Sequence, residues 1–512
     1  MSRPTMGALA ALAVTAASVC VAAPGAVAGP PACGSRVNNT HAKLAECITV
    51  AGVREHQAAL QTIANAHHGT RVSGSTGYDA SVDYVVQRLT AAGYTPQVQP
   101  FVFNTFITLG PAVLERVAPA PAGPVATSIL SYSGSGDVTA AVTAVPGPAS
   151  DATPGCEAAD FAGFPAAGIA LVSRGGCTFA LKAQNAYAAG ASAVVIANNA
   201  AGELNGTLGD AFTLDIPVTS VTQAVGTQLA TTPGLVMHVK TSTFRGPATT
   251  YNVLAETTAG DDGNVVMAGA HLDSVNAGPG INDNGSGSAA LLEVAEQLAK
   301  VNPPNTVRFA WWGAEESTLV GSTRYVTGLT EDERSRIALY LNFDMVASPN
   351  PVYFVYDGDD SDASGAGPGP PGSARIEKTF EAFYSRRHVP FKGTDFSGRS
   401  DYGPFVAAGI PSGGLFTGAE GVKTPQVAAS WGGTAGQPYD RCYHRACDTL
   451  ANVDLRALDV NSDAMGFAIL QYAMNTFDVN GLPGKDNFPP VDPTTTPAPA
   501  TTGQGGLQGS SR

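Results

Sequence analysis

Apolar positions recur at helical spacing in several stretches of this chain. One stretch runs from Val53 to Ala66, and a second runs from Tyr78 to Ala91 before a Gly-Tyr stop. Each pattern predicts an amphipathic helix. Further helices are predicted over residues 286–300, 319–326, 375–387 and 454–477.

Short apolar runs rich in β-forming residues lie between several of these helices. They read YNVLAE, NVVMAGAHLDS, TVRFAWWGAEE and IALYLNFDMV, starting at residues 251, 264, 306 and 337. Strands that alternate with helices form βαβ units, so the pattern predicts an α/β fold with a largely parallel sheet covered on both faces. In such a sheet the chemistry gathers at the carboxyl ends of the strands.

The composition changes between about Ala118 and Thr243 to Ala, Pro, Gly, Val and Ser with few charges. Residues 167–199 alternate a short apolar strand, a turn, a helix and another apolar strand, which predicts a small domain inserted into a larger one. We therefore expect a main domain formed by two parts of the chain, an inserted domain, and a tail rich in Pro, Thr, Gly and Ser without fixed structure. The expected bounds are 29–117 and 245–482 for the main domain, 118–244 for the insert and 483–512 for the tail.

The first 28 residues are typical of an export signal. Arg3 precedes an apolar, Ala-rich run over 7–21, and the residues AVA ending at Ala28 offer a cleavage site. The run is short for a membrane span, and no later segment is long and apolar enough to form one. Cys20 follows a bulky valine where a lipid-modified cysteine needs a small neighbour. We expect cleavage after Ala28 and an extracellular protein with neither a lipid anchor nor a transmembrane segment.

Six cysteines remain after the signal. An even number in an exported chain indicates disulfides, and three local pairs are the simplest assignment, although the sequence alone does not fix the connectivity. These pairs are Cys33–Cys47, Cys156–Cys177 and Cys442–Cys447. A cysteine zinc cluster is the alternative, but it lacks CxxC pairs.

The overall composition is that of a globular protein, with 44% hydrophobic and 14% charged residues. The formal net charge of -14 argues against nucleic acid as a partner, because phosphate binding needs a basic face.

Imidazoles and carboxylates stand where the predicted strands end or in the loops that follow. Taken singly, each has an ordinary explanation, such as a turn residue or a satisfied polar side chain. Taken together they indicate a metal site, because buried carboxylates must be paired or coordinate a metal. The residues are His271, Asp273, Asp283, Glu315, Glu316, Asp344 and His444.

The ligand types favour zinc over calcium or magnesium, because imidazole suits borderline metals. Two ions about 3.5–4 Å apart need a shared ligand, and a carboxylate such as Asp283 can bridge them with its two oxygens. Glu315 and Glu316 are neighbours in a segment that we expect to be extended, so their side chains should project to different sides. One can then bind metal while the other acts as general base.

Long motifs carry a resemblance to a known family. They are AGAHLDS, GINDNGSGSAALLE, RFAWWGAEE, YLNFDM, GRSDYGPF, GGLFTGAEG, WGGTAGQPYDRCYH and CDTL. They resemble the secreted bacterial di-zinc leucyl aminopeptidases of the actinomycete (Streptomyces griseus) type over roughly residues 53–106 and 250–477. The resemblance implies a phosphorylase/hydrolase-like three-layer α/β/α sandwich with a co-catalytic zinc pair.

The insert carries a second resemblance. The segments GIALVSRGGCTF, KAQNAYAAGASAVVIANN and IPVTSVTQAVG resemble a protease-associated domain. The insert has no catalytic constellation of its own, so we expect a lid, a substrate-selecting or an interaction role. A neutral spacer is the alternative.

The family resemblance implies which residues bind the two zinc ions. His271, Asp283 and Asp344 would bind one, and Asp283, Glu316 and His444 the other, with Asp283 bridging. Some relatives also bind calcium through an N-terminal aspartate and two aspartates on the last helix. Asp459 and Asp463 match that pair, but no aspartate stands around Cys47-Ile48, so the sequence supports calcium only in part.

The same resemblance implies catalytic roles. Glu315 would activate a metal-bridging water, Tyr443 would hydrogen-bond the oxyanion, and Asp273 would orient His271. Arg399 would contact the substrate, with a surface ion pair as the alternative. The walls of the pocket for the first side chain would be Met345, Phe416 and Cys442–Cys447.

The expected activity is hydrolysis of the N-terminal residue of peptides, with preference for large apolar residues such as Leu, by a monomer. Glu315 and Asp344 can also attract the free ammonium group of such a substrate. A carboxypeptidase or dipeptidase would need a cationic clamp, for which only Arg399 is placed. A metal-free binding module should have broken ligand positions, whereas all five ligands are present.

Overall fold

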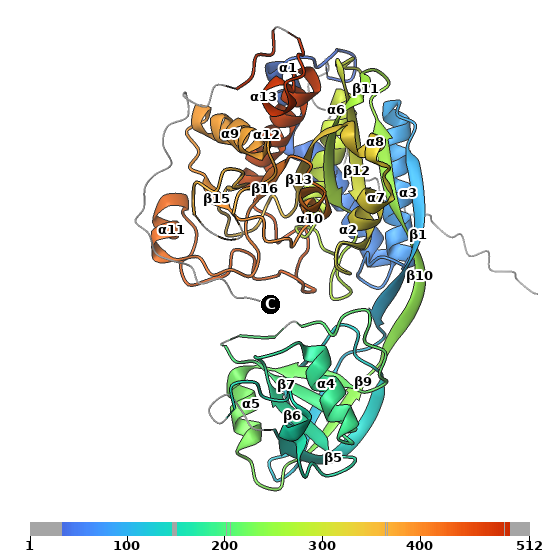
Figure 1. The fold of residues 1–512 in the computed structure, drawn as a ribbon, viewed down its shortest axis with the longest axis vertical. Coiled ribbons are helices and arrows are strands. Elements are labelled where there is room, and N and C mark those ends of the chain that lie inside the picture. Colours follow the sequence, from blue (N-terminus) through green and yellow to red (C-terminus); the bar gives the residue numbers. More distant parts are fainter. Residues whose placement is uncertain are drawn as a thin grey trace, which may run out of the picture.

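The computed structural model describes residues 33–145, 151–200, 202–204, 206–363, 365, 367–485 and 487–491. The expected signal peptide, Cys20 and the tail beyond residue 491 lie outside the described residues. The chain forms two lobes, each around its own sheet, joined by a long pair of antiparallel strands (Figure 1).

The larger lobe contains a mixed eight-stranded sheet. In order across the sheet its strands are β1 (Gln97–Thr108), β10 (Thr243–Glu256), β12 (Asn305–Trp312), β11 (Asp261–His271), β13 (Ile337–Phe343), β16 (Ser412–Phe416), β14 (Phe354–Tyr356) and β15 (Lys392–Thr394). The four strands from β12 to β16 run parallel, and antiparallel pairs flank them on both sides. The carboxyl ends of the central strands therefore meet at one edge.

Helices cover both faces of this sheet, which gives the predicted three-layer α/β/α sandwich. One face carries α2 (Val50–Ala66), α3 (Thr76–Ala92), α6 (Gly285–Leu298), α9 (Ser373–Arg386) and α12 (Leu455–Met474). The other carries α7 (Val320–Gly328), α8 (Glu331–Ser335) and α10 (Tyr402–Ala407). The remaining helices of this lobe are α1 (His41–Ala45), α11 (Pro425–Trp431) and α13 (Phe477–Asn480).

Alternation along the strands explains these two faces. On β11, Val266, Ala268 and Ala270 belong to the core beneath α6 and α12, whereas Val265 and Met267 belong to the core beneath α7 and α10. Successive side chains of a strand point to opposite faces, so a strand buried on both faces is apolar throughout.

The smaller lobe has a second eight-stranded sheet and its own apolar cores. In order across the sheet its strands are β3 (Gly123–Pro124), β2 (Val113–Ala118), β9 (Val236–Thr241), β5 (Gly136–Ala144), β6 (Ile169–Ser173), β7 (Ala193–Ala197), β8 (Val218–Val221) and β4 (Ser128–Ile129). Its helices are η1 (Ala158–Phe161), α4 (Phe179–Ala188) and α5 (Gln223–Ala230). The strand–turn–helix–strand order predicted within 167–199 is present as β6, α4 and β7.

The two lobes are joined by a ribbon that the sequence pattern did not predict. β1 and β10 pair from Gln97 opposite Leu254 to Thr108 opposite Thr243. The apolar run that begins at Tyr251 is only the buried end of the 14-residue strand β10. The earlier half of β10 is mostly exposed or half-buried, so its residues carry no alternating apolar signal.

Helix starts differ from the predictions by a few residues, because polar caps precede the periodic residues. The Thr49 side chain accepts from the Gly52 N–H and the Ser75 side chain from the Tyr78 N–H, so both helices begin before the predicted starts at Val53 and Tyr78. The helix predicted over 454–477 corresponds to α12, which ends at Met474, and α13 is a separate short helix.

Three disulfides are present in the structure. They join Cys33 to Cys47, Cys156 to Cys177 and Cys442 to Cys447, the three local pairs expected from the sequence. Among the described residues, no helix combines the length and apolar character that a bilayer crossing needs.

Candidate metal centre

The predicted metal ligands meet at the carboxyl edge of the parallel strands. His271 is the last residue of β11, and Asp344 directly follows β13. Asp283 lies just before α6, with Asn284 as the N-cap of that helix. Glu316 follows β12 after a short connection, and His444 lies in the loop closed by Cys442–Cys447.

The carboxylate of Asp283 lies between the two imidazoles. Its Oδ1 is 3.3 Å from Nε2 of His271, and its Oδ2 is 3.2 Å from Nε2 of His444. His271 Nε2 also lies 3.3 Å from Asp344 Oδ1, and His444 Nε2 lies 3.0 Å from Glu316 Oε2. The five residues thus form two three-ligand groups that share one aspartate.

Several buried atoms of this cluster have no hydrogen-bond partner within the described residues. They are Nε2 of His271, Oε1 of Glu316 and Oδ1 of Asp344. Leaving such atoms unpaired is costly, and cations bound in the two groups would satisfy them. The imidazole and carboxylate donors form two groups of three that share Asp283, which is the donor set and number of catalytic zinc sites. The residues therefore fit a pair of zinc ions.

The segment that carries Glu315 and Glu316 is a turn, so the prediction that it is extended is wrong. β12 ends at Trp312, Ala314 has a φ of 54°, and the Glu315 carbonyl accepts from the Leu319 N–H at 2.8 Å. The turn nevertheless separates the two side chains. Glu316 faces His444, whereas Oε2 of Glu315 lies 3.9 Å from Nε2 of His271.

Together, burial and the neighbouring charges raise the pKa values of both imidazoles and of both glutamates in this cluster. Burial lowers the pKa of His271, but Glu315 and Asp344 outweigh burial and hold this pKa well above its usual value. His444 behaves in the same way beside Glu316 and Asp283. Burial raises the pKa of Glu315 well above its usual value and that of Glu316 to about 7. The cluster is therefore built to bind cations.

Asp448 holds the backbone at Asp283 in place, although the sequence did not single it out. Its two oxygens accept the backbone N–H groups of Asn282 and Asp283 at 2.8 and 2.9 Å. It is 2% exposed and also accepts from the Asn452 side chain. The motif CDTL contains Asp448, but its spacing does not show that it reaches back to residue 283.

Two further groups position His271 at the end of β11 and Asp344 just after β13. Nδ1 of His271 lies 3.1 Å from the carbonyl oxygen of Asp273 and 3.5 Å from its carboxylate, which also accepts the Glu315 N–H. Asp273 therefore lies where it can orient both a ligand and the expected base. The Ser400 hydroxyl donates to Oδ2 of Asp344 at 2.6 Å.

Tyr443 and Arg399 lie side by side at the open side of the site. Arg399 donates to the Tyr443 hydroxyl at 3.2 Å and to Glu420 at 2.8 Å. Burial raises the pKa of Tyr443 well above its usual value, and Asp283 and Glu316 raise it further. Its hydroxyl therefore keeps its proton. Arg399 is 60% exposed and forms both a surface ion pair with Glu420 and a contact with Tyr443 of the site.

An apolar wall adjoins the cluster. Met345 is 3% exposed, and its carbonyl accepts the Thr417 N–H, which places it beside Phe416. Phe416 stacks on Phe354 with ring centroids 5.9 Å apart, and Phe354 contacts Tyr439 edge-on. The predicted pocket residues Met345 and Phe416 are thus brought together.

Asp459 and Asp463, which match the calcium-binding aspartates of some relatives, are arranged differently from the cluster around Asp283. Asp463 pairs with Arg387 at 2.6 Å, so a guanidinium supplies the positive charge there. Asp459 is exposed, Cys47 is in a disulfide and Ile48 is buried. This arrangement does not favour the calcium site that the sequence supported only in part.

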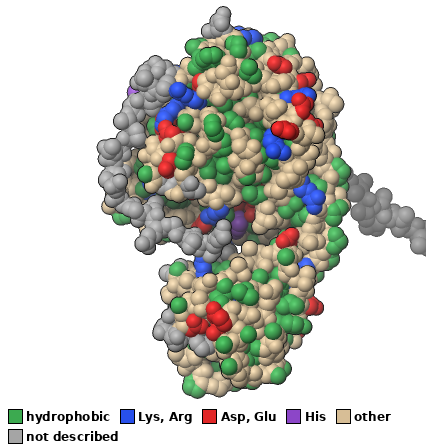
Figure 2. Space-filling model, in the orientation of Figure 1, with side chains coloured by type: hydrophobic (Ala, Val, Ile, Leu, Met, Phe, Trp, Pro, Cys, Tyr) green, Lys and Arg blue, Asp and Glu red, His purple; other side chains and the backbone are tan. Residues whose placement is uncertain are grey.

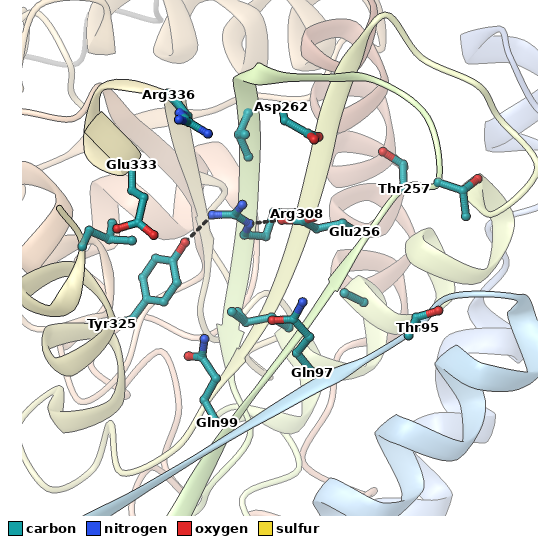
Figure 3. A pocket seen from close by; sticks show the side chains of 15 residues that line it. Thr95, Gln97, Gln99, Glu256, Thr257, Asp262, Arg308, Tyr325, Glu333 and Arg336 are labelled. Atoms are coloured by element: carbon teal, nitrogen blue, oxygen red, sulfur yellow. Dashed lines mark hydrogen bonds and ion pairs between the residues drawn. The ribbon is translucent and has the colours of Figure 1, made fainter. Parts of the chain in front are cut away.

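A cavity of about 580 Å³ lies at the opposite edge of the sheet, where the parallel strands begin (Figure 3). Arg308 points into it but is already paired with Glu256 and with the Tyr325 hydroxyl. None of the metal-cluster residues lines this cavity.

Comparison with known proteins identifies two regions. Residues 252–469 match Peptidase family M28, and residues 138–229 match the PA domain. An aminopeptidase of Pseudomonas aeruginosa (strain UCBPP-PA14) is 48% identical over 444 residues, covering 85% of this chain and 82% of the relative. Leucine aminopeptidase 2 of Trichophyton rubrum is 41% identical over 423 residues, covering 81% and 82%. A solved aminopeptidase from Aneurinibacillus sp. strain AM-1 is similar with a TM-score of 0.65 and 27% identity, covering 88% of this chain and 99% of that one.

Zinc binding should release protons, because zinc needs neutral imidazoles and ionised carboxylates. The raised pKa values of His271 and His444 mean that metal affinity falls as the pH falls, about tenfold per pH unit for each proton displaced. Titration calorimetry of the metal-free protein near pH 7, in buffers of different protonation enthalpy, measures the release. Identical enthalpies in all buffers would contradict this charge balance.

Replacing Asp448 should loosen the bridging carboxylate. Asp448→Ala removes both acceptors of the Asn282 and Asp283 N–H groups and should weaken metal binding about 10–100-fold in competition with a chelator. Asp448→Asn keeps one acceptor and should lose less. The exposed Asp459→Asn is the matched control. Equal metal affinity in wild type and Asp448→Ala would remove Asp448 from this role.

Proposed function

The chain belongs to peptidase family M28, and on that premise we propose that it is a zinc-dependent aminopeptidase that removes large apolar N-terminal residues such as Leu from peptides. The observation that carries the proposal is Asp283, whose two oxygens face one imidazole each, with Glu315 close by. The matching names of relatives at 48% and 41% identity support the aminopeptidase assignment.

His271, Asp283 and Asp344 would hold one zinc ion, and Asp283, Glu316 and His444 the other. When bound, the ions lower the pKa of water and polarise the scissile carbonyl. Glu315 takes the proton from the attacking water, since it is buried and directed to the His271 side of Asp283. It can then deliver that proton to the leaving amino group. Asp273 holds the Glu315 backbone at this place.

Tyr443 stabilises the negative charge that develops on the substrate carbonyl oxygen. Its raised pKa keeps the hydroxyl protonated as a donor, and Arg399 lies 3.2 Å from that hydroxyl. A fixed donor beside a developing oxyanion lowers the barrier of acyl transfer. Glu420 holds Arg399 from its other side and so fixes the pair.

The acidic surroundings favour a substrate with a free amino terminus. Glu315 and Asp344 can attract its ammonium group, and Met345 with Phe416 offers an apolar surface for its first side chain. A carboxypeptidase would need a free cationic clamp, but Arg399 is engaged by Glu420 and Tyr443. A metal-free binding module is disfavoured because the cluster leaves buried ligand atoms unpaired in the absence of a cation.

Secretion is part of the proposal. It is supported by the export-type first 28 residues and by the three disulfides, which are typical of oxidising compartments. The assignment to the actinomycete-type leucyl aminopeptidases is supported by the shared motifs from AGAHLDS to CDTL.

Glu315→Ala should lower kcat about a hundred- to ten-thousandfold, because it removes the proton acceptor. Its zinc content should equal that of the wild type, since Glu315 is not a proposed ligand. His444→Ala is the matched comparison and should lower zinc content as well as activity. Elemental analysis beside rate measurements separates the two roles. Near-wild-type turnover by Glu315→Ala would remove it as general base.

Hydrolysis should require a free amino terminus on the substrate. Leucine p-nitroanilide should be hydrolysed, whereas its N-acetyl derivative should not, because acetylation removes the ammonium group. A chelator should abolish the hydrolysis, and added zinc should restore it. Cleavage of the acetylated substrate at a comparable rate would rule out an aminopeptidase.

A further inference from the structure

Four buried residues in the connection between α2 and α3 contact two loops of the metal centre. They are Thr70, Arg71, Val72 and Ser73, which we call the clamp segment, and each is 7% exposed or less. Connections usually run over the surface, because a buried one must satisfy all its backbone polar groups. The burial of the clamp segment therefore depends on partners in the surrounding loops.

The Arg71 side chain donates to three backbone carbonyls of the loop over residues 272–282. Its Nε donates to Pro279 at 2.9 Å, and its Nη2 donates to Gly280 at 2.8 Å. Its Nη1 donates to Leu272, the first residue of the loop. One guanidinium group thus ties the start of this loop to its later half.

This loop connects two ligands of the same proposed zinc ion. His271 directly precedes the loop, and Asp283 directly follows it. A guanidinium is planar and its N–H groups point in fixed directions, so it holds the tied carbonyls at a set separation. A lysine ammonium is a compact charge on a flexible stem and lacks this fork. Arg71 is therefore suited to fix the distance between the two ligands.

The backbone and the other side chains of the clamp segment add contacts to the same loop. The Arg71 N–H donates to the Ser274 hydroxyl at 2.9 Å, and that hydroxyl donates to the Gly278 carbonyl at 2.9 Å. The Thr70 hydroxyl donates to the Val275 carbonyl, also at 2.9 Å. The loop is thus held along its length and not only at its ends.

Ser73 contacts the turn that carries Glu315. Its hydroxyl oxygen accepts the Ala314 N–H at 2.7 Å and the Thr250 hydroxyl at 3.1 Å. Ala314 has a φ of 54°, which is uncommon for a residue with a side chain, so this turn needs contacts that hold it. The clamp segment therefore touches both the loop between two ligands and the turn of the expected base.

The clamp segment lies on the side of the metal centre away from the substrate. The surface is hollowed between the two lobes, where histidine and acidic side chains are visible (Figure 2). Arg71 and Ser73 are both 0% exposed. They cannot touch a peptide in this hollow, so any effect they have on the reaction passes through the residues they hold.

We propose that Arg71 and Ser73 are positioning residues of the metal centre. Arg71 sets the separation of His271 and Asp283 and so acts on metal binding. Ser73 sets the place of Glu315 and so acts on proton transfer. This inference rests on the proposed zinc-dependent function and adds to it a segment from outside the metal-binding motifs.

The first test compares Arg71→Lys with Arg308→Lys. Arg71→Lys keeps the charge but loses the fork, and it should weaken zinc binding about tenfold in competition with a chelator. Arg308→Lys is the matched control, because Arg308 is a largely buried arginine that pairs with Glu256 at the opposite edge of the same sheet. The control should lower the unfolding temperature but keep the wild-type zinc affinity.

Hydrogen exchange of the metal-free protein measures the loop itself. Amides of residues 272–282 should exchange faster in Arg71→Lys than in the wild type, whereas those of α12 should keep their rate. Equal acceleration in both regions would show a loss of global stability and contradict the positioning role. If Arg71→Lys does not fold, Ser274→Ala removes the acceptor of the Arg71 N–H and should weaken zinc binding about two- to tenfold.

Ser73→Ala should give the opposite division of effects. It removes the acceptor of the Ala314 N–H and should lower kcat about tenfold while zinc affinity stays at the wild-type value. Ser462→Ala, a buried serine of α12 that donates to the Leu458 carbonyl, is the matched control and should change neither quantity.

Three results would decide against parts of this account. Wild-type zinc affinity in Arg71→Lys, or an equal loss in Arg308→Lys, would overturn the role of Arg71. Wild-type kcat in Ser73→Ala would overturn the role of Ser73. A wild-type protein that binds no zinc would instead overturn the proposed function.

Discussion

Charge compensation in a buried acidic cluster is the constraint on which this structure depends. Four carboxylates surround the two imidazoles, and Asp283 lies between both rings. Burial makes ionised carboxylates costly unless a cation or proton neutralises them. The surrounding carboxylates hold the pKa values of His271 and His444 well above their usual range, so protonated imidazoles can offset part of the negative charge. The imidazole and carboxylate groups of the cluster suit zinc, which would neutralise the carboxylate charge more fully than protons do. Zinc would also supply the Lewis acid for hydrolysis.

Several features of the fold position the residues of this cluster. Parallel strands bring His271 and Asp344 to one edge, and Asp448 fixes Asp283 through two backbone N–H groups. The cysteine loop then adds His444 and Tyr443 from a distant part of the chain. Because the loops that carry these groups also contact the smaller lobe, the inserted domain is tied to the catalytic edge and not only to the ribbon.

The sequence predicted much of this arrangement because its strongest signals are local. Apolar runs ending in acids or histidines predicted the strand-end cluster, and cysteine proximity predicted the disulfides. The prediction failed where a segment carries no clear pattern of its own and where long-range contacts decide the structure. A turn replaces the extended segment at Glu315 because its carbonyl bonds to Leu319, and the exposed half of β10 carries no periodic signal. Asp448 contacts Asp283, which lies 165 positions away, and Arg445 pairs with Glu203, which lies 242 positions away. The spacing of residues along the chain cannot show such contacts.

In the proposed site one carboxylate, that of Asp283, would hold two metal ions. An anomalous difference map from crystals of the zinc-loaded protein, measured at the zinc edge, tests it most directly. We expect two peaks about 3.5–4 Å apart on either side of the Asp283 carboxylate, one beside His271 and Asp344 and one beside His444 and Glu316. A single peak, or zinc bound away from Asp283, would contradict the account.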